Sequence, residues 1–226
     1  MPRVPTKLVT WEEIVEWSRG LANIIKRSGW RPDVIVAIAR GGYVPARLLC
    51  DFLGVENLLS IQSQHWTEAA KAEEKAVLRF PYVVDMSGKK VLLVDDIVDT
   101  GDTVILAEKF IKENWNPIEV KIAVLQWISP VAKIKPDFYF IEVKEWVWFQ
   151  YPWTRLEDVT SFIKRMIHEE AKSGRSVWTF EDIVNNFREW YGIDVDKYFY
   201  EDALENLIEI GFLTRKNDLY IYKGEA

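Results

Sequence analysis

Cysteine is almost absent from the sequence, which has only Cys50 among its 226 residues. A single cysteine excludes an internal disulfide framework and favours a reducing, cytoplasmic location. Long apolar runs are missing as well. No stretch reaches the ~18 apolar residues of a transmembrane helix, and residues 1–7 lack the apolar core of a signal peptide. We therefore expect no membrane partner.

An excess of basic charge is also missing. The net charge is −6, with 35 acidic and 29 basic residues. This balance gives no general attraction to nucleic acid, so we expect no nucleic-acid partner. Aromatic residues are plentiful by contrast, including 11 tryptophans. Most of them must lie in a core, because large aromatic side chains supply much of the free energy of burial.

The first part of the chain alternates short apolar runs with helical patterns. Strands are predicted at residues 34–38, 91–94, 120–125 and 138–143, and helices at 10–26, 44–53 and 104–114. Continuous apolar strands that alternate with helices indicate an α/β fold with a parallel sheet covered on both faces. The connection over residues 63–88 is long, and its composition fits a lid and a solvated hairpin equally well.

The pattern changes after Trp153, where a second unit is predicted. Helices are expected at residues 155–171, from Thr179 onward and at 202–210, followed by hairpin strands at 212–214 and 219–222. Three helices and a small hairpin are typical of a winged-helix-like α+β unit. We therefore divide the chain into domains 1–155 and 156–226, which suits its length at about 100–200 residues per domain.

The segment over residues 91–103 carries the most chemical information. A buried apolar strand delivers the adjacent carboxylates of Asp95 and Asp96 to its carboxyl end, where open parallel sheets bind ligands. The turn that follows, residues 100–103, leads into a helix and directs N–H groups and hydroxyls at one spot, as a phosphate site requires. Asp99 and Asp102 would repel a phosphate unless their carboxylates point away from it.

This segment resembles the phosphoribosyl pyrophosphate (PRPP) signature of type I phosphoribosyltransferases. The signature has an apolar strand, two acidic residues, two apolar residues and then Asp-Thr-Gly-x-Thr, which here is Asp99 to Thr103. The resemblance implies the type I fold, a parallel-sheet core with flanking helices and a small hood. It also implies an enzyme that joins a purine base to the ribose of PRPP and releases pyrophosphate.

Two further segments support the resemblance, which is closest to the 6-oxopurine enzymes. Ala39-Arg40-Gly41-Gly42 is similar to the Ser-Arg-Gly-Gly pyrophosphate loop of bacterial xanthine/guanine enzymes, with alanine in place of serine. Residues 145–153 resemble the hood, in which Trp-x-x-x-Pro-Trp covers the base. By that spacing Trp148 is expected to stack on the purine, as aromatic side chains stack on bases elsewhere.

The resemblance assigns roles residue by residue. Asp95 and Asp96 are expected to hold the ribose hydroxyls, directly or through Mg²⁺, the implied cofactor. Asp99 is the expected proton acceptor for the base. The 5′-phosphate is expected at Asp99, Thr100, Gly101, Asp102 and Thr103, and the pyrophosphate at Ala39, Arg40 and Gly41. Members of this family usually form homodimers, and we expect one here.

The base itself is predicted from one position. The 6-oxopurine enzymes carry a lysine at the end of the strand after the PRPP helix, where it donates to the purine O6. Aligned on Pro130, that position is Ser129, whose hydroxyl tolerates a 6-amino group. We therefore favour adenine, with hypoxanthine, guanine or xanthine as the alternative. Lys121, Lys133 and Lys135 lie nearby but out of register.

A PRPP-binding transcription regulator is the alternative from another class, because some regulators use this fold. From Thr160 onward acidic residues outnumber basic ones, and no basic recognition stripe is present. The catalytic motifs are also complete, which a regulator does not need. We therefore predict an enzyme for purine salvage.

Overall fold

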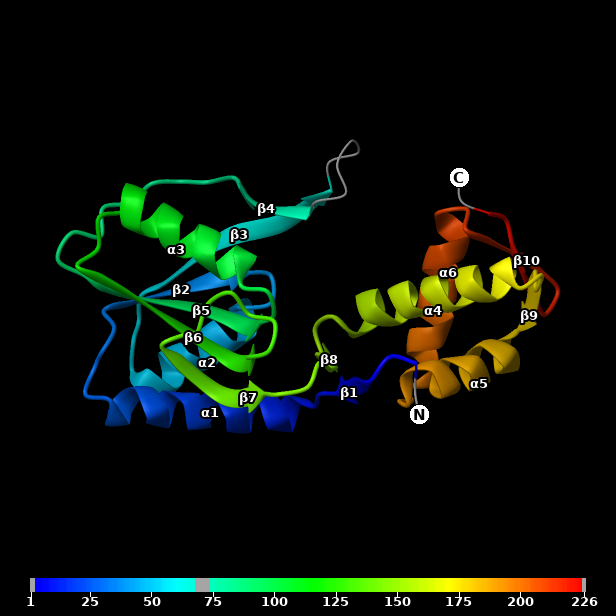
Figure 1. Ribbon diagram of the computed structural model, residues 1–226, viewed down its shortest axis with the longest axis horizontal. Coiled ribbons are helices and arrows are strands. Elements are labelled where there is room, and N and C mark those ends of the chain that lie inside the picture. The colour runs from blue at the N-terminus through cyan, green and yellow to red at the C-terminus, as the bar shows by residue number, and fades with distance from the viewer. Residues whose placement is uncertain (1–2, 68–73, 225–226) are drawn as a thin grey trace. The chain divides into compact units, whose positions relative to one another are not determined.

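The structure is a computed structural model that describes residues 3–67 and 74–224 (Figure 1). The chain forms two compact units. One comprises Trp11–Trp146, and the other combines the segment up to Thr10 with the chain from Val147 onward. Across the described residues, no helix has both the length and the apolar character needed to span a membrane.

A six-stranded sheet forms the centre of the Trp11–Trp146 unit, with strand order β4-β3-β2-β5-β6-β7. The strands are β2 Val34–Ala39, β3 Leu58–Thr67, β4 Glu74–Arg79, β5 Lys90–Val98, β6 Glu119–Ile128 and β7 Phe138–Val143. All neighbouring pairs are parallel except β3 and β4. Every residue of β2 is buried, as a strand covered on both faces requires. The predicted α/β fold is confirmed.

Three helices cover this sheet (Figure 1). Helices α1 (Trp11–Arg27) and α2 (Tyr43–Leu53) pack on one face, and α3 (Asp102–Asn114) packs on the other. The α3 side holds an apolar core in which Trp115 is completely buried. The indole N–H of Trp115 donates to the backbone oxygen of Tyr82 at 2.8 Å, so this buried indole is paired.

The long connection over residues 63–88 contains part of a hairpin. Strands β3 and β4 pair antiparallel, from Gln62 opposite Arg79 to Thr67 opposite Glu74. Residues 68–73, between them, lie outside the described part of the chain. Of the two interpretations of this connection, a lid and a hairpin, the hairpin describes strands β3 and β4. A lid function of the segment stays a prediction.

The other unit joins both ends of the chain. Its elements are β1 Thr6–Leu8, β8 Trp148–Gln150, α4 Arg155–Lys172, β9 Val177–Thr179, α5 Phe180–Tyr191, α6 Lys197–Glu209, β10 Leu213–Lys216 and β11 Leu219–Tyr222. Strands β1 and β8 form a parallel pair, and β10-β11-β9 form an antiparallel sheet. The sequence predicted the three helices and the hairpin of β10 and β11. It did not predict β9 or the participation of the N-terminal segment.

Aromatic packing builds the core of this unit. Phe162 of α4 stacks on Tyr191 of α5 with ring centroids 4.0 Å apart, and Trp178 is fully buried with its N–H donating to Glu170 at 2.7 Å. Val4 belongs to the same core, and its N–H donates to the backbone oxygen of Trp190 at 3.0 Å. The N-terminal segment is thus an integral part of this unit.

Candidate functional site

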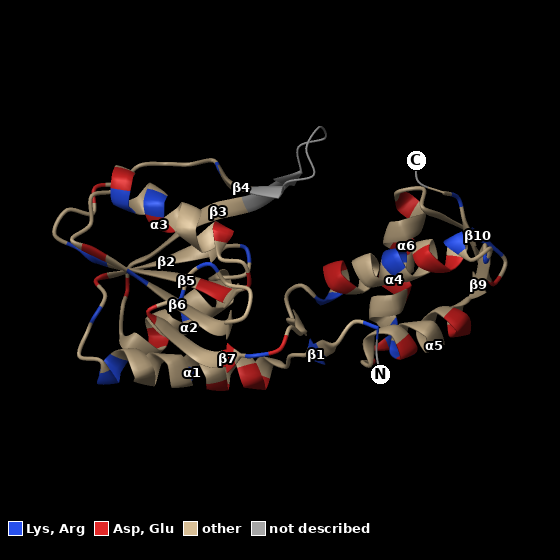
Figure 2. Cartoon of the chain, in the orientation of Figure 1, with Lys and Arg blue, Asp and Glu red and all other residues tan. Residues whose placement is uncertain are grey.

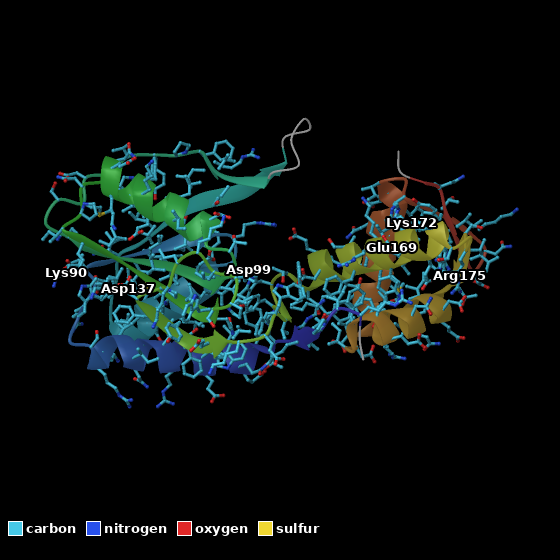
Figure 3. The ribbon with its side chains drawn as sticks, viewed as in Figure 1. Lys90, Asp99, Asp137, Glu169, Lys172 and Arg175 are labelled. Carbon is cyan, nitrogen blue, oxygen red and sulfur yellow. The ribbon has the colours of Figure 1, made fainter. Side chains whose placement is uncertain are left out.

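Three neighbouring parallel strands end at one edge of the sheet in the Trp11–Trp146 unit. Strand β5 lies between β2 and β6, so their carboxyl ends lie side by side. The residues singled out from the sequence lie at these ends: 39–42 at and after the end of β2, 95–103 on and after β5, and Ser129 after β6. Figure 3 shows Asp99 at this edge and Lys90 and Asp137 at the opposite end of the sheet. Ligands of open parallel sheets bind at the carboxyl edge.

The adjacent carboxylates of Asp95 and Asp96 are nearly buried, with 9% of each residue exposed. Asp95 Oδ1 accepts the Asp96 N–H at 2.9 Å, and Asp96 Oδ1 accepts the Ile97 N–H at 2.8 Å. Burial, reinforced by the negative charge of Asp96, raises the pKa of Asp95 well above its usual range. The pair is therefore poised to gain stabilisation from a hydroxyl donor or a cation.

The loop after β2 approaches this acidic pair closely because it contains two glycines. The loop passes from Ala39 through a cis peptide bond to the exposed Arg40, and helix α2 begins after Gly42. A Cβ atom on Gly41 would collide with the carboxylate of Asp96, and one on Gly42 would collide with the backbone oxygen of Val94. The predicted pyrophosphate loop and the acidic pair thus lie in direct contact.

The turn after β5 forms a cavity of about 210 Å³, lined by the residues from Asp95 to Val104. Gly101 adopts φ 90°, a left-handed conformation that favours glycine, and precedes the first residue of α3. The first N–H groups of a helix have no partner within the helix, which is why anions bind at helix N-termini. Asp99 is exposed in this turn, but nearby protein atoms desolvate its carboxylate and raise its pKa.

The carboxylate of Asp102 has definite partners. Lys133 Nζ donates to Oδ1 at 2.7 Å and to Oδ2 at 2.9 Å, and the Thr100 hydroxyl donates to Oδ2 at 3.0 Å. The sequence required this carboxylate to avoid a phosphate but did not identify Lys133 as its partner. An acidic residue at the variable position of Asp-Thr-Gly-x-Thr is the signal that calls for a compensating cation.

The two predicted base contacts lie in different units. Ser129 follows β6, and its hydroxyl donates to the backbone oxygen of Val143 at 3.5 Å. Trp148 lies in β8, is 39% exposed, and meets Phe162 edge to face with centroids 5.6 Å apart. The out-of-register lysines have other neighbours: Lys121 is near the start of β6, and Lys135 lies over the rings of Trp127 and Tyr139.

Comparison with known proteins agrees with this geometry. Residues 6–157 match the phosphoribosyl transferase domain. The chain is 31% identical to the purine phosphoribosyltransferase of Pyrococcus horikoshii Ot3, with a TM-score of 0.57, over 66% of this chain and 94% of that one.

The chain belongs to the purine phosphoribosyltransferase family.

Two other solved structures share the fold. A hypothetical protein from Neisseria gonorrhoeae with bound ppGpp is 27% identical, with a TM-score of 0.57, over 68% of this chain and 90% of that one. The xanthine-guanine-hypoxanthine phosphoribosyltransferase of Helicobacter pylori is 20% identical, also with a TM-score of 0.57, over 69% of this chain and 99% of that one. The prediction of a phosphoribosyltransferase enzyme is thus confirmed.

Proposed function

We propose that this phosphoribosyltransferase converts a purine base and PRPP into a purine nucleoside 5′-monophosphate and pyrophosphate. The observation that carries the proposal is the cavity of about 210 Å³ at the end of β5. It combines two buried carboxylates with a glycine turn at a helix N-terminus. A sugar phosphate offers hydroxyls to the first and an anion to the second.

Each part of PRPP has a matching part of the site. Asp95 and Asp96 accept hydrogen bonds from the ribose hydroxyls, and the backbone of residues 100–103 holds the 5′-phosphate. The loop of Ala39, Arg40 and Gly41 holds the pyrophosphate, because the Arg40 guanidinium and the loop N–H groups supply positive charge. The contact between Gly41 and the Asp96 carboxylate keeps the ribose and pyrophosphate subsites adjacent.

The donor set at the acidic pair suits Mg²⁺. Carboxylate oxygens are the ligands that this ion prefers, and it usually keeps several waters. Among the described residues no three acidic, histidine or cysteine side chains gather as a metal site, so Asp95 and Asp96 with substrate oxygens would hold the ion. When bound, Mg²⁺ supplies positive charge to the leaving pyrophosphate.

The reaction exchanges one bond to the ribose C1′ for another. The bond from C1′ to the pyrophosphate oxygen breaks before the bond from C1′ to purine N9 forms. Positive charge therefore develops on the sugar, as the resemblance to this family implies. Asp99 accepts the proton that the base loses. The remaining contribution of the site is to position both reactants and to stabilise the developing charge.

For the base, the hydrogen bonding of Ser129 favours adenine. Its hydroxyl donates to the Val143 oxygen, which leaves the oxygen lone pairs of Ser129 to accept from a 6-amino group. The relatives give adenine no support: the Pyrococcus enzyme is named for no particular base, and the Helicobacter enzyme is named for three oxopurines. Hypoxanthine, guanine and xanthine are therefore the alternative substrates.

The deciding experiment offers adenine, hypoxanthine, guanine and xanthine separately to the purified protein with Mg²⁺ and PRPP, and follows nucleotide formation by absorbance. Turnover of adenine supports the whole proposal. Turnover of the oxopurines alone retains the enzyme and refutes the interpretation of Ser129. No turnover of any purine would contradict the proposed function.

The C-terminal unit is proposed to be winged-helix-like and to serve assembly rather than DNA binding. Acidic and basic residues are interspersed over α4, α5 and α6 (Figure 2), whereas a DNA-binding face needs a basic stripe. We propose a homodimer in the cytoplasm, to be tested by sedimentation equilibrium. Tight, salt-sensitive binding of duplex DNA in fluorescence anisotropy would instead support a regulator.

A further inference from the structure

The turn proposed to bind the 5′-phosphate contains an unfavourable charge. Asp102 is the first residue of α3 and lines the cavity. A carboxylate there stabilises the helix dipole, but it also competes with a phosphate for the same positive end. A turn that binds an anion and contains an acidic residue therefore needs a positive charge beside that residue.

A segment distant in sequence supplies this positive charge. After β6 the chain returns to the turn, where the Lys133 N–H donates to the backbone oxygen of Thr100 at 2.9 Å. A Cβ atom on Gly101 would lie only 2.8 Å from Ile134 Cγ2, so the Ile134 side chain packs against the backbone of Gly101. These contacts fix the backbone from which the Lys133 ammonium reaches both oxygens of Asp102, at 2.7 and 2.9 Å.

We infer that Lys133 is a positioning residue for PRPP, which neutralises Asp102 and holds its carboxylate so that the turn accepts the 5′-phosphate. The inference rests on the proposed function. The side chains of Lys133 and Asp102 are 61% and 39% exposed, and exposed ion pairs add little to stability. The backbone bond from Lys133 to Thr100 already attaches the segment, so the ammonium is not needed to hold it in place.

The first test removes the positive charge of Lys133 and keeps a side chain of similar length. Lys133→Met is expected to raise the KM for PRPP about three- to tenfold at low salt and to leave kcat within about twofold, since it removes a charge near a bound anion. The difference in KM should shrink as NaCl rises from about 0.05 M to about 1 M, because salt screens exposed charges. Lys133→Arg should retain a KM near that of the unaltered protein.

A matched control exists on α3, the helix that begins at Asp102. Lys112 pairs with Glu108 at the same 2.7 Å, four residues apart on α3 and away from the turn. Lys112→Met removes the same charge and an ion pair of the same length. Its KM for PRPP is expected to match that of the unaltered protein at every salt concentration.

A double substitution separates charge neutralisation from a structural tie. If the ammonium acts by neutralising Asp102, Asp102→Asn combined with Lys133→Met restores most of the PRPP affinity that Lys133→Met loses. If the ion pair acts as a tie, the double variant binds PRPP as weakly as Lys133→Met. That result, or an unchanged KM in Lys133→Met at low salt, overturns the inference.

The PRPP dependence of the melting temperature is measured in parallel and needs no turnover. Lys133→Met should need about three- to tenfold more PRPP than the unaltered protein for the same rise in Tm. Absence of purine turnover in the unaltered protein contradicts the proposed function alone. A normal PRPP response of Lys133→Met, in a protein that does turn over a purine, contradicts only the role of Lys133.

Discussion

Asp99 combines exposure with a raised carboxyl pKa, a combination that suits a group that accepts a proton and remains accessible to a substrate. Asp99→Asn should lower kcat by about a hundredfold and change the KM for PRPP by less than about threefold. Because the pKa is raised, the carboxylate becomes protonated at a higher pH than an ordinary aspartate. The acidic limb of the kcat profile should therefore lie above about pH 4 and disappear in the variant.

Steady-state kinetics of both proteins across pH test this role. An Asp99→Asn variant that keeps kcat within about twofold would show that the proton goes elsewhere.

The buried pair of Asp95 and Asp96 makes stability depend on pH. Burial raises the pKa of Asp95, so the folded protein retains a proton at pH values where the unfolded chain has released it. The free energy of unfolding should consequently fall as the pH rises from about 4 through the pKa of the folded state. Asp95→Asn cannot ionise, and at neutral pH it should be more stable by about 1 kcal/mol, although PRPP binding is lost.

Urea unfolding of the ligand-free proteins between pH 4 and pH 8, about the range where this proton is released, measures the effect. Asp218→Asn, at an exposed turn of the other unit, is the control and should retain the pH dependence of the unaltered protein. If the free energy of unfolding of Asp95→Asn depends on pH as strongly as that of the unaltered protein, a group other than Asp95 is responsible.

Ser129 is the residue on which the choice of base depends. Ser129→Lys introduces an ammonium that donates to a 6-oxo group and repels a 6-amino hydrogen. The ratio of kcat/KM for hypoxanthine to that for adenine should rise by about tenfold to a hundredfold, since a site that bonds one exocyclic group rejects the other. Ser176→Lys, on the exposed surface of the other unit, adds the same charge without this change. An unaltered ratio in Ser129→Lys would exclude Ser129 as a base contact.

At the scale of elements, the loop between β2 and α2 depends on a glycine that admits a neighbouring side chain. A Cβ atom on Gly41 would collide with the Asp96 carboxylate. Gly41→Ala should therefore displace Asp96 and raise the KM for PRPP by about tenfold or more. In the control, Gly174→Ala in the other unit, the Cβ has open space but the backbone has φ 94°, so the alanine strains the backbone there while PRPP binding should be unchanged. An unaffected Gly41→Ala would mean that this contact does not organise the site.

The elements that the sequence predicted well are those whose pattern is local. Strands β2, β5 and β6 are largely buried apolar runs, and β7 is a mostly apolar run that is buried at its two ends, so their apolar composition identified them. Strands β1, β8 and β9 have three residues each, too few to show a pattern, and β3 mixes polar with apolar residues. Helix α6 begins at Lys197, earlier than predicted, because its first turn is aromatic and polar rather than regularly amphipathic.

At the scale of the whole molecule, both ends of the chain share one core. Val4 is buried with residues of α4, α5 and α6, and Arg155 Nη2 donates to the backbone oxygen of Val9 at 2.6 Å. Deleting residues 156–226 therefore removes the packing partners of the N-terminal segment and of β8. The truncated chain should melt at least about 10 °C lower than the full chain and bind a hydrophobic dye.

A chain that ends at Gly224 is the control for this truncation and should melt like the full protein. If residues 1–155 alone retain the melting temperature and the kinetics of the full chain, then the last 71 positions contribute nothing to either property.

The sequence by itself determined which chemical groups the β5 turn carries and in what order, because strand, acidic pair, glycine turn and helix are contiguous along the chain. The family followed from that local pattern. Only the tertiary structure decided which distant segments meet: Lys133 with Asp102, Gly41 with Asp96, and Val4 with the C-terminal helices. These contacts depend on how strands and helices far apart in the sequence pair and pack, and local periodicity carries no record of that choice.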